Sequence, residues 1–394
     1  MRRSDTGILT THVGALPPPV DVWGNAAITE AELQSAVREV VRQQRAAGID
    51  IVNEGELTKG GNWVSYVNGR LGGFEPATAS DGATVSLLLR SKDWTDFSEY
   101  YKRAMERGTL FEETRTAPEQ AGARRDWECT SPLTYRGQAA LQREIDTLRA
   151  SLGGMPASDA FLTSTAPASL EPGRVNKYYK SDEEYVFALA EALRVEYEMI
   201  ANAGFLLQVD DAWLAALWDR IGIPMGLEAY KRYCMVRVEA LNHALRNIPE
   251  EQVRYHLCWG SWHGPHSQDI PLRDIVDVLL AVKAQTYLFE AANVRHEHEF
   301  QVWEDVKLPA GKILAPGVVT HSTALIEHPE LVSARIQRFA KIVGRENVVG
   351  STDCGLGLRC HPQIAWAKLK ALADGARLAT AALYGSRTTS LPAR

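Results

Sequence analysis

A regular alternation of β-rich and amphipathic helical segments runs through most of this 394-residue sequence and limits the folds open to it. The β-rich segments are short and enriched in Val, Ile, Thr and aromatic residues, and they occupy residues 8–16, 49–53, 159–167, 205–209, 253–259, 286–289, 313–319 and 347–351. Eight strands separated by helices are typical of the α/β class and predict a (β/α)8 TIM barrel. We therefore expect residues 1–394 to form a single barrel domain.

Helical periodicity fills most of the intervals between these strands. The expected helices cover residues 29–47, 136–152, 181–203, 227–247, 272–284, 329–343 and 362–373. The first begins with a capping-box sequence, Thr29-Glu30-Ala31-Glu32, and ends at Gly48. An open, doubly wound sheet is the alternative to the barrel, but no glycine-rich phosphate loop follows any of the strands, which disfavours it.

Residues 72–135 interrupt the alternation after the second strand. Residues 92–107 are rich in aromatic and charged side chains, and residues 114–125 are polar. Long irregular segments inside a regular fold are usually functional. We interpret this segment as an insertion within the barrel that either covers a site or forms the contact of a homo-oligomer.

The composition of the chain argues against several classes of partner. The net charge is −6 and no basic stripe or tail is visible, which disfavours a general binder of nucleic acid or of membrane surfaces. Neither a signal peptide nor a membrane helix is evident, and the five cysteines are few and odd in number. We therefore expect a cytoplasmic protein with reduced thiols and a small-molecule partner.

Polar side chains gather at the positions where the expected strands end. They are His12, Glu54, Glu56, Asp210, Asp211, His256, Cys258, Glu290, His321, Asp353 and Cys354. In TIM barrels the loops that follow the strands form the active-site face. Each of these residues alone could be an ordinary loop residue, but their joint position indicates one reactive site.

Four of these residues form a candidate zinc site. His256 and Cys258 alternate at one strand end and so point to the same face, while Glu290 and Cys354 lie at the ends of two other strands. Imidazole, thiolate and carboxylate groups are the ligands that tetrahedral Zn²⁺ accepts. Because these ligands come from separate strands and not from a local Cys-x-x-Cys motif, we expect the metal in the barrel mouth, within reach of a substrate.

The same residues carry a resemblance to a known family. The chain resembles the cobalamin-independent methionine synthases, specifically their C-terminal catalytic barrel and the single-barrel relatives that include epoxyalkane:coenzyme M transferases. The matching motifs follow the family order and comprise residues 10–14, residues 48–56, Gln208-Val209-Asp210-Asp211, His256-x-Cys258, Glu290, Pro316-Gly317-Val318 with His321, and Asp353-Cys354-Gly355-Leu356.

The resemblance implies a zinc ion that activates a substrate thiol for attack on carbon. His256, Cys258, Glu290 and Cys354 would hold the ion, and Glu290 would be the ligand that yields when the thiol arrives. This agrees with the chemistry of the residues, because metal coordination deprotonates a thiol whose pKa is otherwise about 8.5. Two cysteinate ligands would leave the bound sulfur nucleophilic enough to take up an alkyl group.

The resemblance also implies roles for residues outside the zinc set. Residues 12–15, which include His12 and Gly14, would hold the amino and carboxylate ends of a homocysteine-like thiol together with Glu56. Asp210 would bind the amino group, and His321 would donate a proton to the leaving group. The plain structural alternatives are a helix N-terminal charge for Glu56, a cap for Asp210, and an ordinary loop histidine for His321.

The sequence departs from the family in two respects. It has no length for the second, N-terminal barrel of full-length methionine synthases, which disfavours a folate methyl donor. The family's Asp-Glu-Pro or Asp-Asp-Pro turn is replaced by Asp210-Asp211-Ala212-Trp213, which removes a rigid proline and adds a bulky ring. Three functions therefore stay open: methyl or alkyl transfer to a thiol, epoxide opening or C–S bond cleavage by a zinc thiolate, and a non-catalytic barrel with structural zinc.

Several further residues near these motifs have no assigned role. We expect His263, His266, His296 and His298 to be solvated loop histidines, and Cys234 to pack in the core. Arg295 is one of several arginines that could bind the carboxylate or sulfonate tail of a thiol.

Overall fold

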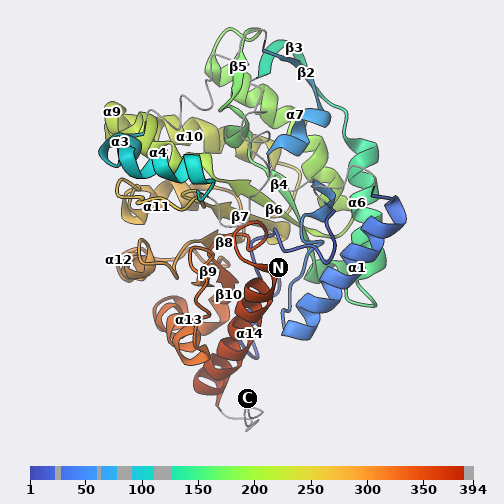
Figure 1. Ribbon diagram of the computed structural model, residues 1–394, viewed down its shortest axis with the longest axis vertical. Coiled ribbons are helices and arrows are strands. Elements are labelled where there is room, and N and C mark those ends of the chain that lie inside the picture. The colour runs from blue at the N-terminus through green and yellow to red at the C-terminus, as the bar shows by residue number, and fades with distance from the viewer. Residues whose placement is uncertain (23–27, 60–63, 78–90, 111–126, 386–394) are drawn as a thin grey trace.

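One curved parallel sheet forms the centre of the molecule (Figure 1). The computed structural model describes residues 1–22, 28–59, 64–77, 91–110 and 127–385. In sheet order the strands are β1 (Leu9–Thr10), β10 (Val349–Thr352), β9 (Ile313–Val319), β8 (Thr286–Phe289), β7 (Val253–Leu257), β6 (Leu206–Asp211) and β4 (Phe161–Thr165), all paired in parallel. The bounds of β8 and β9 are those expected from the sequence.

The expected second strand closes this sheet into a barrel, although it is reduced to a bridge. Asp50 and Ile51 donate backbone hydrogen bonds to the carbonyl of Thr10 at 3.2 and 3.1 Å, and Val52 forms a parallel bridge with Ala160. Residues 49–53 thus join β1 to β4, the two outer strands of the sheet order. The predicted eight-part α/β barrel is therefore confirmed.

The side chain of Gln44 explains why this second strand is so short. Its Nε2 donates to the carbonyl of Asn53 at 2.7 Å, and its Oε1 accepts from the Asn53 N–H at 3.0 Å. The two backbone groups that would have extended the strand pairing are therefore satisfied by a residue of helix α1 (Glu30–Ala47).

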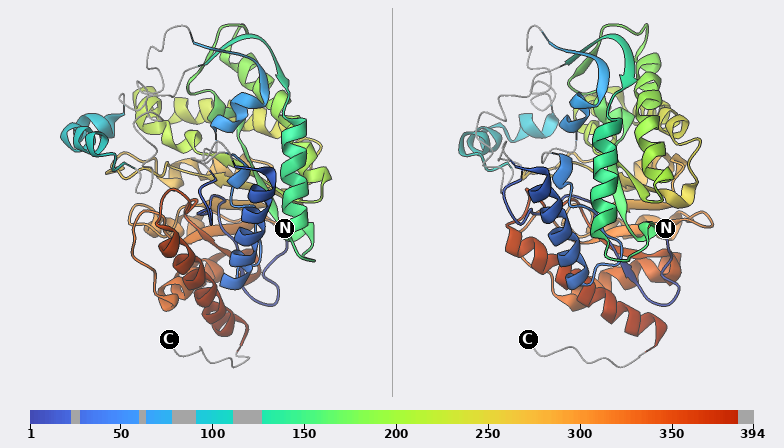
Figure 2. Two further views of the ribbon diagram at one scale, coloured as in Figure 1. Left: turned by 45° about the vertical axis from the view of Figure 1, so that its right-hand side comes forward. Right: turned by 90° about the vertical axis from the view of Figure 1, so that its right-hand side faces the viewer.

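Long helices surround the sheet in the same order as the strands that they connect. They are α1, α6 (Gln138–Ser151), α7 (Asp182–Asn202), α10 (Leu227–Ala244), α11 (Leu272–Ala281), α13 (Pro329–Val343) and α14 (Pro362–Tyr384). Helix α1 packs against α6 on one side and α14 on the other (Figure 2). Shorter helices are α8 (Trp213–Ala216), α9 (Ile223–Met225) and α12 (Val302–Asp305).

The helix ends show where local sequence decided the structure and where packing did. Thr29 and Glu32 form the expected capping box of α1, and Gly48 ends that helix with a φ of 93°. Helix α14 was expected to end at residue 373 but continues to Tyr384. It passes through Gly375, where an added Cβ would lie 2.4 Å from the Val332 side chain of α13. That glycine allows α13 and α14 to approach closely.

The 72–135 segment contributes elements outside the barrel. Strands β2 (Leu71–Pro76), β3 (Trp127–Tyr135) and β5 (Arg174–Asn176) form a second, three-stranded sheet, at the top of Figure 1. Helices α3 (Lys92–Asp96) and α4 (Ser98–Arg107) follow, and α3 contacts the helical turn Trp218–Gly222. Residues 78–90 and 111–126, which include the polar stretch expected at 114–125, lie outside the described residues.

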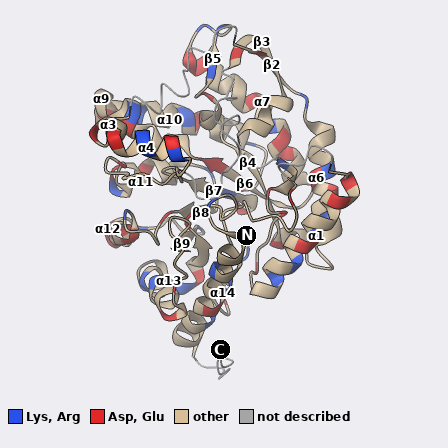
Figure 3. Cartoon of the chain, in the orientation of Figure 1, with Lys and Arg blue, Asp and Glu red and all other residues tan. Residues whose placement is uncertain are grey.

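Apolar side chains fill both the interior of the barrel and the layer between strands and helices. One small cluster inside the barrel contains Ile51, Phe161 and Leu206, and a second contains Val13, Leu288, Ile313, Ala315 and Val349. The much larger outer cluster includes the buried Cys234, as expected. Among the described residues no helix combines the length and apolar character needed to cross a bilayer. Acidic and basic residues are interspersed over the outer helices (Figure 3).

Candidate metal and thiol site

His256, Cys258 and Cys354 come together at the carboxyl ends of the barrel strands. One ligand atom from each lies within 4.8 Å of the other two. The Sγ atoms of Cys258 and Cys354 are 4.0 Å apart, although the residues are 96 positions apart in the chain. His256 belongs to β7, and Cys354 follows β10. The barrel thus brings together three of the four predicted zinc ligands.

The fourth predicted ligand, Glu290, follows β8 and lies at the edge of this group. Its Oε1 is 3.9 Å from Cys258 Sγ and 3.4 Å from the backbone nitrogen of Trp259. Its Oε2 accepts hydrogen bonds from Asn293 Nδ2 at 2.6 Å and Arg295 Nη2 at 2.5 Å. We call His256, Cys258, Glu290 and Cys354 the strand-end cluster.

The donor atoms of the strand-end cluster fit a zinc ion. Nδ1 of His256 lies 3.0 Å from Asp210 Oδ1, and its Nε2 is buried without a hydrogen-bond partner among the described residues. A neutral imidazole that donates from Nδ1 leaves the Nε2 lone pair free, which is the usual arrangement of a zinc-bound histidine with a carboxylate behind it. Two thiols and a carboxylate complete a set that zinc accepts.

The pKa values of the two thiols in the cluster are shifted in opposite directions. The contact with Cys354 and burial raise the pKa of Cys258, whereas the hydrogen bond from Cys258 lowers the pKa of Cys354 to about 7. Burial acts to raise the pKa of Glu290, but the charge of Arg295 keeps it below its ordinary value. One thiolate and one carboxylate are therefore available near neutral pH to bind a cation.

Glu56 and Asp210 place two carboxyl groups on the opposite flank of His256. Glu56 is buried and has a left-handed backbone, with a φ of 58°. Burial, followed by the charge of Asp210, raises the pKa of Glu56 to about 8. A Cβ added to Gly14 would lie 2.2 Å from Glu56 Oε1, so only glycine leaves room for this carboxyl group. The barrel thus brings together Gly14, Glu56 and Asp210.

His12 is buried in the same part of the barrel. Its Nε2 lies 2.7 Å from Gln44 Oε1, and its Nδ1 has no hydrogen-bond partner in the described part of the chain. Burial lowers the pKa of His12 to about 3, so the ring is neutral at pH 7. Arg254 fixes this segment by donating to the carbonyl of His12 and to Thr11 Oγ1, both at 2.9 Å.

His321 lies with Glu290 and Asp353 in a second group, whose ligand atoms are also within 4.8 Å of one another. Burial lowers the pKa of His321 to about 3, and its Nδ1 has no hydrogen-bond partner within the described ranges. The ring is therefore a neutral group beside the strand-end cluster. Its role as a proton donor stays a prediction, as do the ligand and substrate roles of the other site residues.

Two residues with supporting contacts were given no role in the sequence analysis. Asp353 accepts hydrogen bonds from the N–H groups of Ala291 and Ala292 at 2.8 and 2.9 Å, and from Asn293 Nδ2 at 2.9 Å. It therefore fixes the turn that carries Glu290. Arg254 is fully buried inside the barrel. Its spacing of two residues from His256 on one strand was the signal that could have placed it on the same face.

The expectation of solvated loop histidines was wrong for His266 and His296. Both are buried, and both contact Asp269, at 3.1 and 3.3 Å respectively. Asp269 also binds Arg295 at 2.5 Å. Arg295 is therefore held between Asp269 and Glu290, so its guanidinium is already engaged and is not available to bind the carboxylate or sulfonate tail of a substrate.

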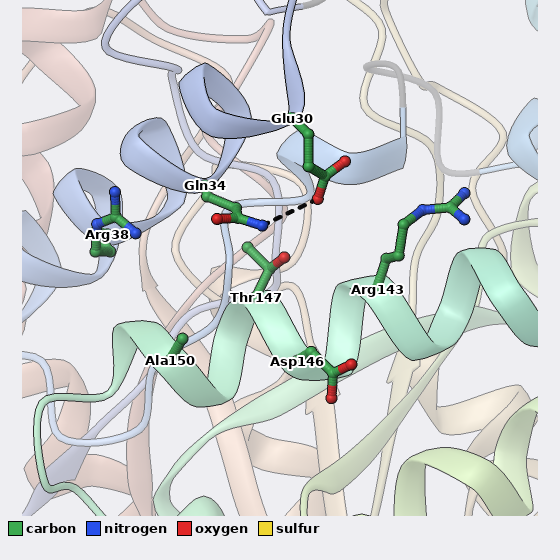
Figure 4. Close-up of a pocket in the computed structure, with 7 residues that line it drawn as sticks. All are labelled: Glu30, Gln34, Arg38, Arg143, Asp146, Thr147 and Ala150. Atoms are coloured by element: carbon green, nitrogen blue, oxygen red, sulfur yellow. Dashed lines mark hydrogen bonds between the residues drawn. The ribbon is translucent and has the colours of Figure 1, made fainter.

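A shallow hollow of about 300 Å³ lies elsewhere, on the outside of the barrel between α1 and α6 (Figure 4). Its lining residues come from these two helices: Glu30, Gln34, Arg38, Arg143, Asp146, Thr147 and Ala150. It shares no residue with the strand-end cluster, so we do not assign the chemistry of the protein to it.

Comparisons with known proteins agree with the fold and identify the family. Residues 163–378 match the family described as cobalamin-independent synthase, catalytic domain. A methionine synthase of Saccharolobus solfataricus is 25% identical over 220 residues, which are 55% of this chain and 57% of that protein. The 2-hydroxypropyl-CoM lyase of Xanthobacter autotrophicus is 22% identical over 427 aligned positions, which cover 97% of this chain and 98% of the lyase.

Solved structures give the same result for the fold. The B12-independent methionine synthase from Shewanella sp. W3-18-1, solved in complex with selenomethionine, superposes with a TM-score of 0.66 over 94% of this chain and 97% of that one, at 18% identity. The family match covers more than half of the sequence and includes the strands that carry all four cluster residues. The chain belongs to the cobalamin-independent methionine synthase family.

Proposed function

We propose that this protein is a zinc-dependent transferase that binds a small-molecule thiol and alkylates its sulfur, with a methyl group as the leading candidate. The observation that carries the proposal is the strand-end cluster, in which His256 Nε2 and two thiols converge beside Glu290. We further propose that residues 1–394 act as one catalytic domain, with 72–135 as an accessory segment.

Each residue of the site has a proposed task in this reaction. Zinc held by the strand-end cluster would deprotonate the substrate thiol and keep its sulfur nucleophilic. Asp210 orients His256 through the 3.0 Å contact to Nδ1. The new bond forms between sulfur and the alkyl carbon while the bond from that carbon to the leaving group breaks. His321, whose ring is neutral, would take up the proton that the thiol loses and pass it to the leaving group; its Nδ1 has no hydrogen-bond partner among the described residues.

The carboxyl groups of Glu56 and Asp210, beside the strand-end cluster, favour a thiol substrate that carries an ammonium group. Glu56 and Asp210 are both buried, and each carboxylate there disfavours a second negative charge. An aminothiol such as homocysteine would neutralise the pair, with the backbone around His12 and Gly14 close to its carboxylate. A sulfonate would instead need a cation, and Arg254 and Arg295 already have charged or carbonyl and hydroxyl partners. Arg359, whose charge acts on Cys354, donates to Ser261 Oγ at 2.7 Å.

A second candidate function is cleavage or formation of a C–S bond by a zinc thiolate, including the opening of an epoxide. The lyase from Xanthobacter autotrophicus favours it, because that relative aligns along nearly the whole chain whereas the methionine synthase aligns over about half. A non-catalytic barrel with structural zinc is the third candidate. It gives no reason for the buried Glu56 and Asp210 beside the cluster.

A product assay separates these candidates. The zinc-loaded protein is incubated with L-homocysteine or 2-mercaptoethanesulfonate, each with a methyl donor or with epoxypropane, and the thioethers are identified by mass spectrometry. Methylation of the thiol supports the first function, and epoxide consumption without a methyl donor supports the second. Zinc that stays bound while neither thiol reacts or binds supports the third. Retention of stoichiometric zinc by Cys258→Ser or Cys354→Ser would contradict the proposed ligand set.

A further inference from the structure

Glu290 has a dedicated cationic partner in addition to its neighbours in the strand-end cluster. Its Oε2 accepts from Arg295 Nη2 at 2.5 Å and from Asn293 Nδ2 at 2.6 Å, whereas its Oε1 lies beside Cys258 Sγ. The Oε2 atom of Glu290 is thus hydrogen-bonded to Arg295, and its Oε1 atom is the one that faces the other residues of the cluster.

Arg295 is fixed in this position by a buried network. Its Nη1 binds Asp269 Oδ2 at 2.5 Å, and Asp269 is held in turn by Nδ1 of His266 at 3.1 Å and Nε2 of His296 at 3.3 Å. The Arg295 side chain is only 13% exposed. A planar guanidinium that bridges two carboxylates is a preorganised group, so it keeps its place whether or not Glu290 has another partner.

A buried carboxylate that leaves a metal ion must find another positive group, because an uncompensated buried charge is costly. We infer that Arg295 is a positioning residue that receives the Glu290 carboxylate when a thiol sulfur takes its place beside His256, Cys258 and Cys354. This inference rests on the proposed function. It assigns Arg295 to ligand exchange within the protein and not to the tail of the substrate.

The inference predicts opposite effects on metal and on thiol. Without Arg295, a bound metal ion becomes the main cationic partner of Glu290, so metal affinity is retained or rises. An incoming thiol must then displace a carboxylate that has no other partner, so thiol affinity falls. A role of Arg295 in supporting the local structure would instead weaken both kinds of binding.

Cobalt in place of zinc makes the exchange visible, because each added thiolate strengthens the sulfur-to-cobalt absorption. The full chain is loaded with Co²⁺ and titrated with L-homocysteine and, separately, with 2-mercaptoethanesulfonate. We expect Arg295→Met to raise the thiol dissociation constant by at least about tenfold. Arg295→Lys keeps the positive charge but cannot bridge two carboxylates as a planar guanidinium does, and we expect a smaller rise in the thiol dissociation constant. Chelator competition should show that both variants hold the metal at least as tightly as the wild type.

Arg237→Met is the matched control. Arg237 is also buried and binds Glu171 through two nitrogens, at 3.0 and 2.7 Å, but it lies outside the strand-end cluster. Wild-type thiol affinity in Arg295→Met, or loss of metal together with thiol, would overturn the inference. If Arg295→Met does not fold, Arg295→Lys decides the same question by the same two measurements. A wild type that binds neither thiol would overturn the proposed function itself.

Discussion

Asp210 Oδ1 lies 3.0 Å from Nδ1 of His256, and this contact decides which ring nitrogen faces the two thiols of the strand-end cluster. We expect Asp210→Asn to weaken zinc binding by about 10- to 100-fold, because the tautomer of His256 is no longer fixed by a negative charge. Zinc affinity is measured by chelator competition.

The neighbouring Asp211 provides the control for this change. Its Oδ1 accepts from Ser169 Oγ at 2.9 Å and from the Leu214 N–H at 3.2 Å, so it supports the start of α8. Asp211→Asn should lower the unfolding temperature and leave zinc affinity unchanged. Equal zinc affinity in Asp210→Asn and the wild type would show that Asp210 does not orient the ligand.

Gly14 controls the space available to the Glu56 carboxyl group. A Cβ at this position would lie 2.2 Å from Glu56 Oε1, so Gly14→Ala must displace that side chain. Overpacking of this kind costs about 1 to 3 kcal/mol, and we expect thiol affinity to fall by tenfold or more. The cobalt absorption titration measures it. Gly69→Ala, whose Cβ would meet nothing within 4 Å, should leave thiol affinity unchanged. A thiol affinity in Gly14→Ala equal to that of the wild type would show that Glu56 does not take part in thiol binding.

The fold was predictable because most of its strands are buried on both faces and therefore read as continuous apolar runs between helices. The bounds of β8, β9 and α13 agree with those expected. The second strand was predicted in the right place, but its shortness was not. The shortness of this strand depends on the contact of Gln44 with the backbone of Asn53, which no local sequence pattern predicts.

The grouping of the candidate ligands was predictable for a different reason. In a barrel, residues at successive strand ends share one face, so the positions of His256, Cys258 and Cys354 follow from their order alone. The partners of Arg295 do not follow from order, because they depend on how the loop after β7 packs against the loop after β8. The spacing of His266 from Asp269 was visible in the sequence, but the burial of His266 was not.

His296 should make the stability of the protein depend on pH. Burial alone would lower its pKa, but its contacts with Asp269 and Glu299 raise the pKa from 6.5 to about 9. The folded protein therefore holds this proton more tightly than the unfolded chain. The resulting stabilisation is fully present below pH 6.5 and is lost as the pH rises through 9, and it amounts to about 3 kcal/mol at most.

Urea unfolding of the wild type and His296→Gln tests this dependence. The difference in free energy of unfolding should be largest at about pH 5.5 and should shrink by about pH 9.5. His243→Gln is the control, because His243 is 41% exposed and pairs with Glu191 on the surface. A difference for His296→Gln that stays constant across this range would mean that the histidine stabilises the fold only as a neutral group.

Asp93 ties the 72–135 segment to the loop that carries Asp269. Its Oδ1 accepts from the N–H and Oγ of Ser267 at 2.9 and 2.6 Å, and its Oδ2 accepts from the N–H of His266 at 3.2 Å and from Tyr101 OH at 2.5 Å. Removing these acceptors leaves two loop N–H groups without their partner. Asp93→Ala should therefore speed amide hydrogen exchange at His266 and Ser267.

Asp96→Ala is the matched variant, because Asp96 lies on the same short helix and pairs, among the described residues, with the exposed Lys92 in a surface contact. It should leave exchange in the loop after β7 unchanged. A rise in hydrogen exchange over all helices in Asp93→Ala would indicate global destabilisation and would contradict a local role of Asp93 in holding the loop after β7. If exchange rises only at the loop, thiol affinity should fall with it, because Asp269 and Arg295 then lose the support that keeps Glu290 beside the cluster.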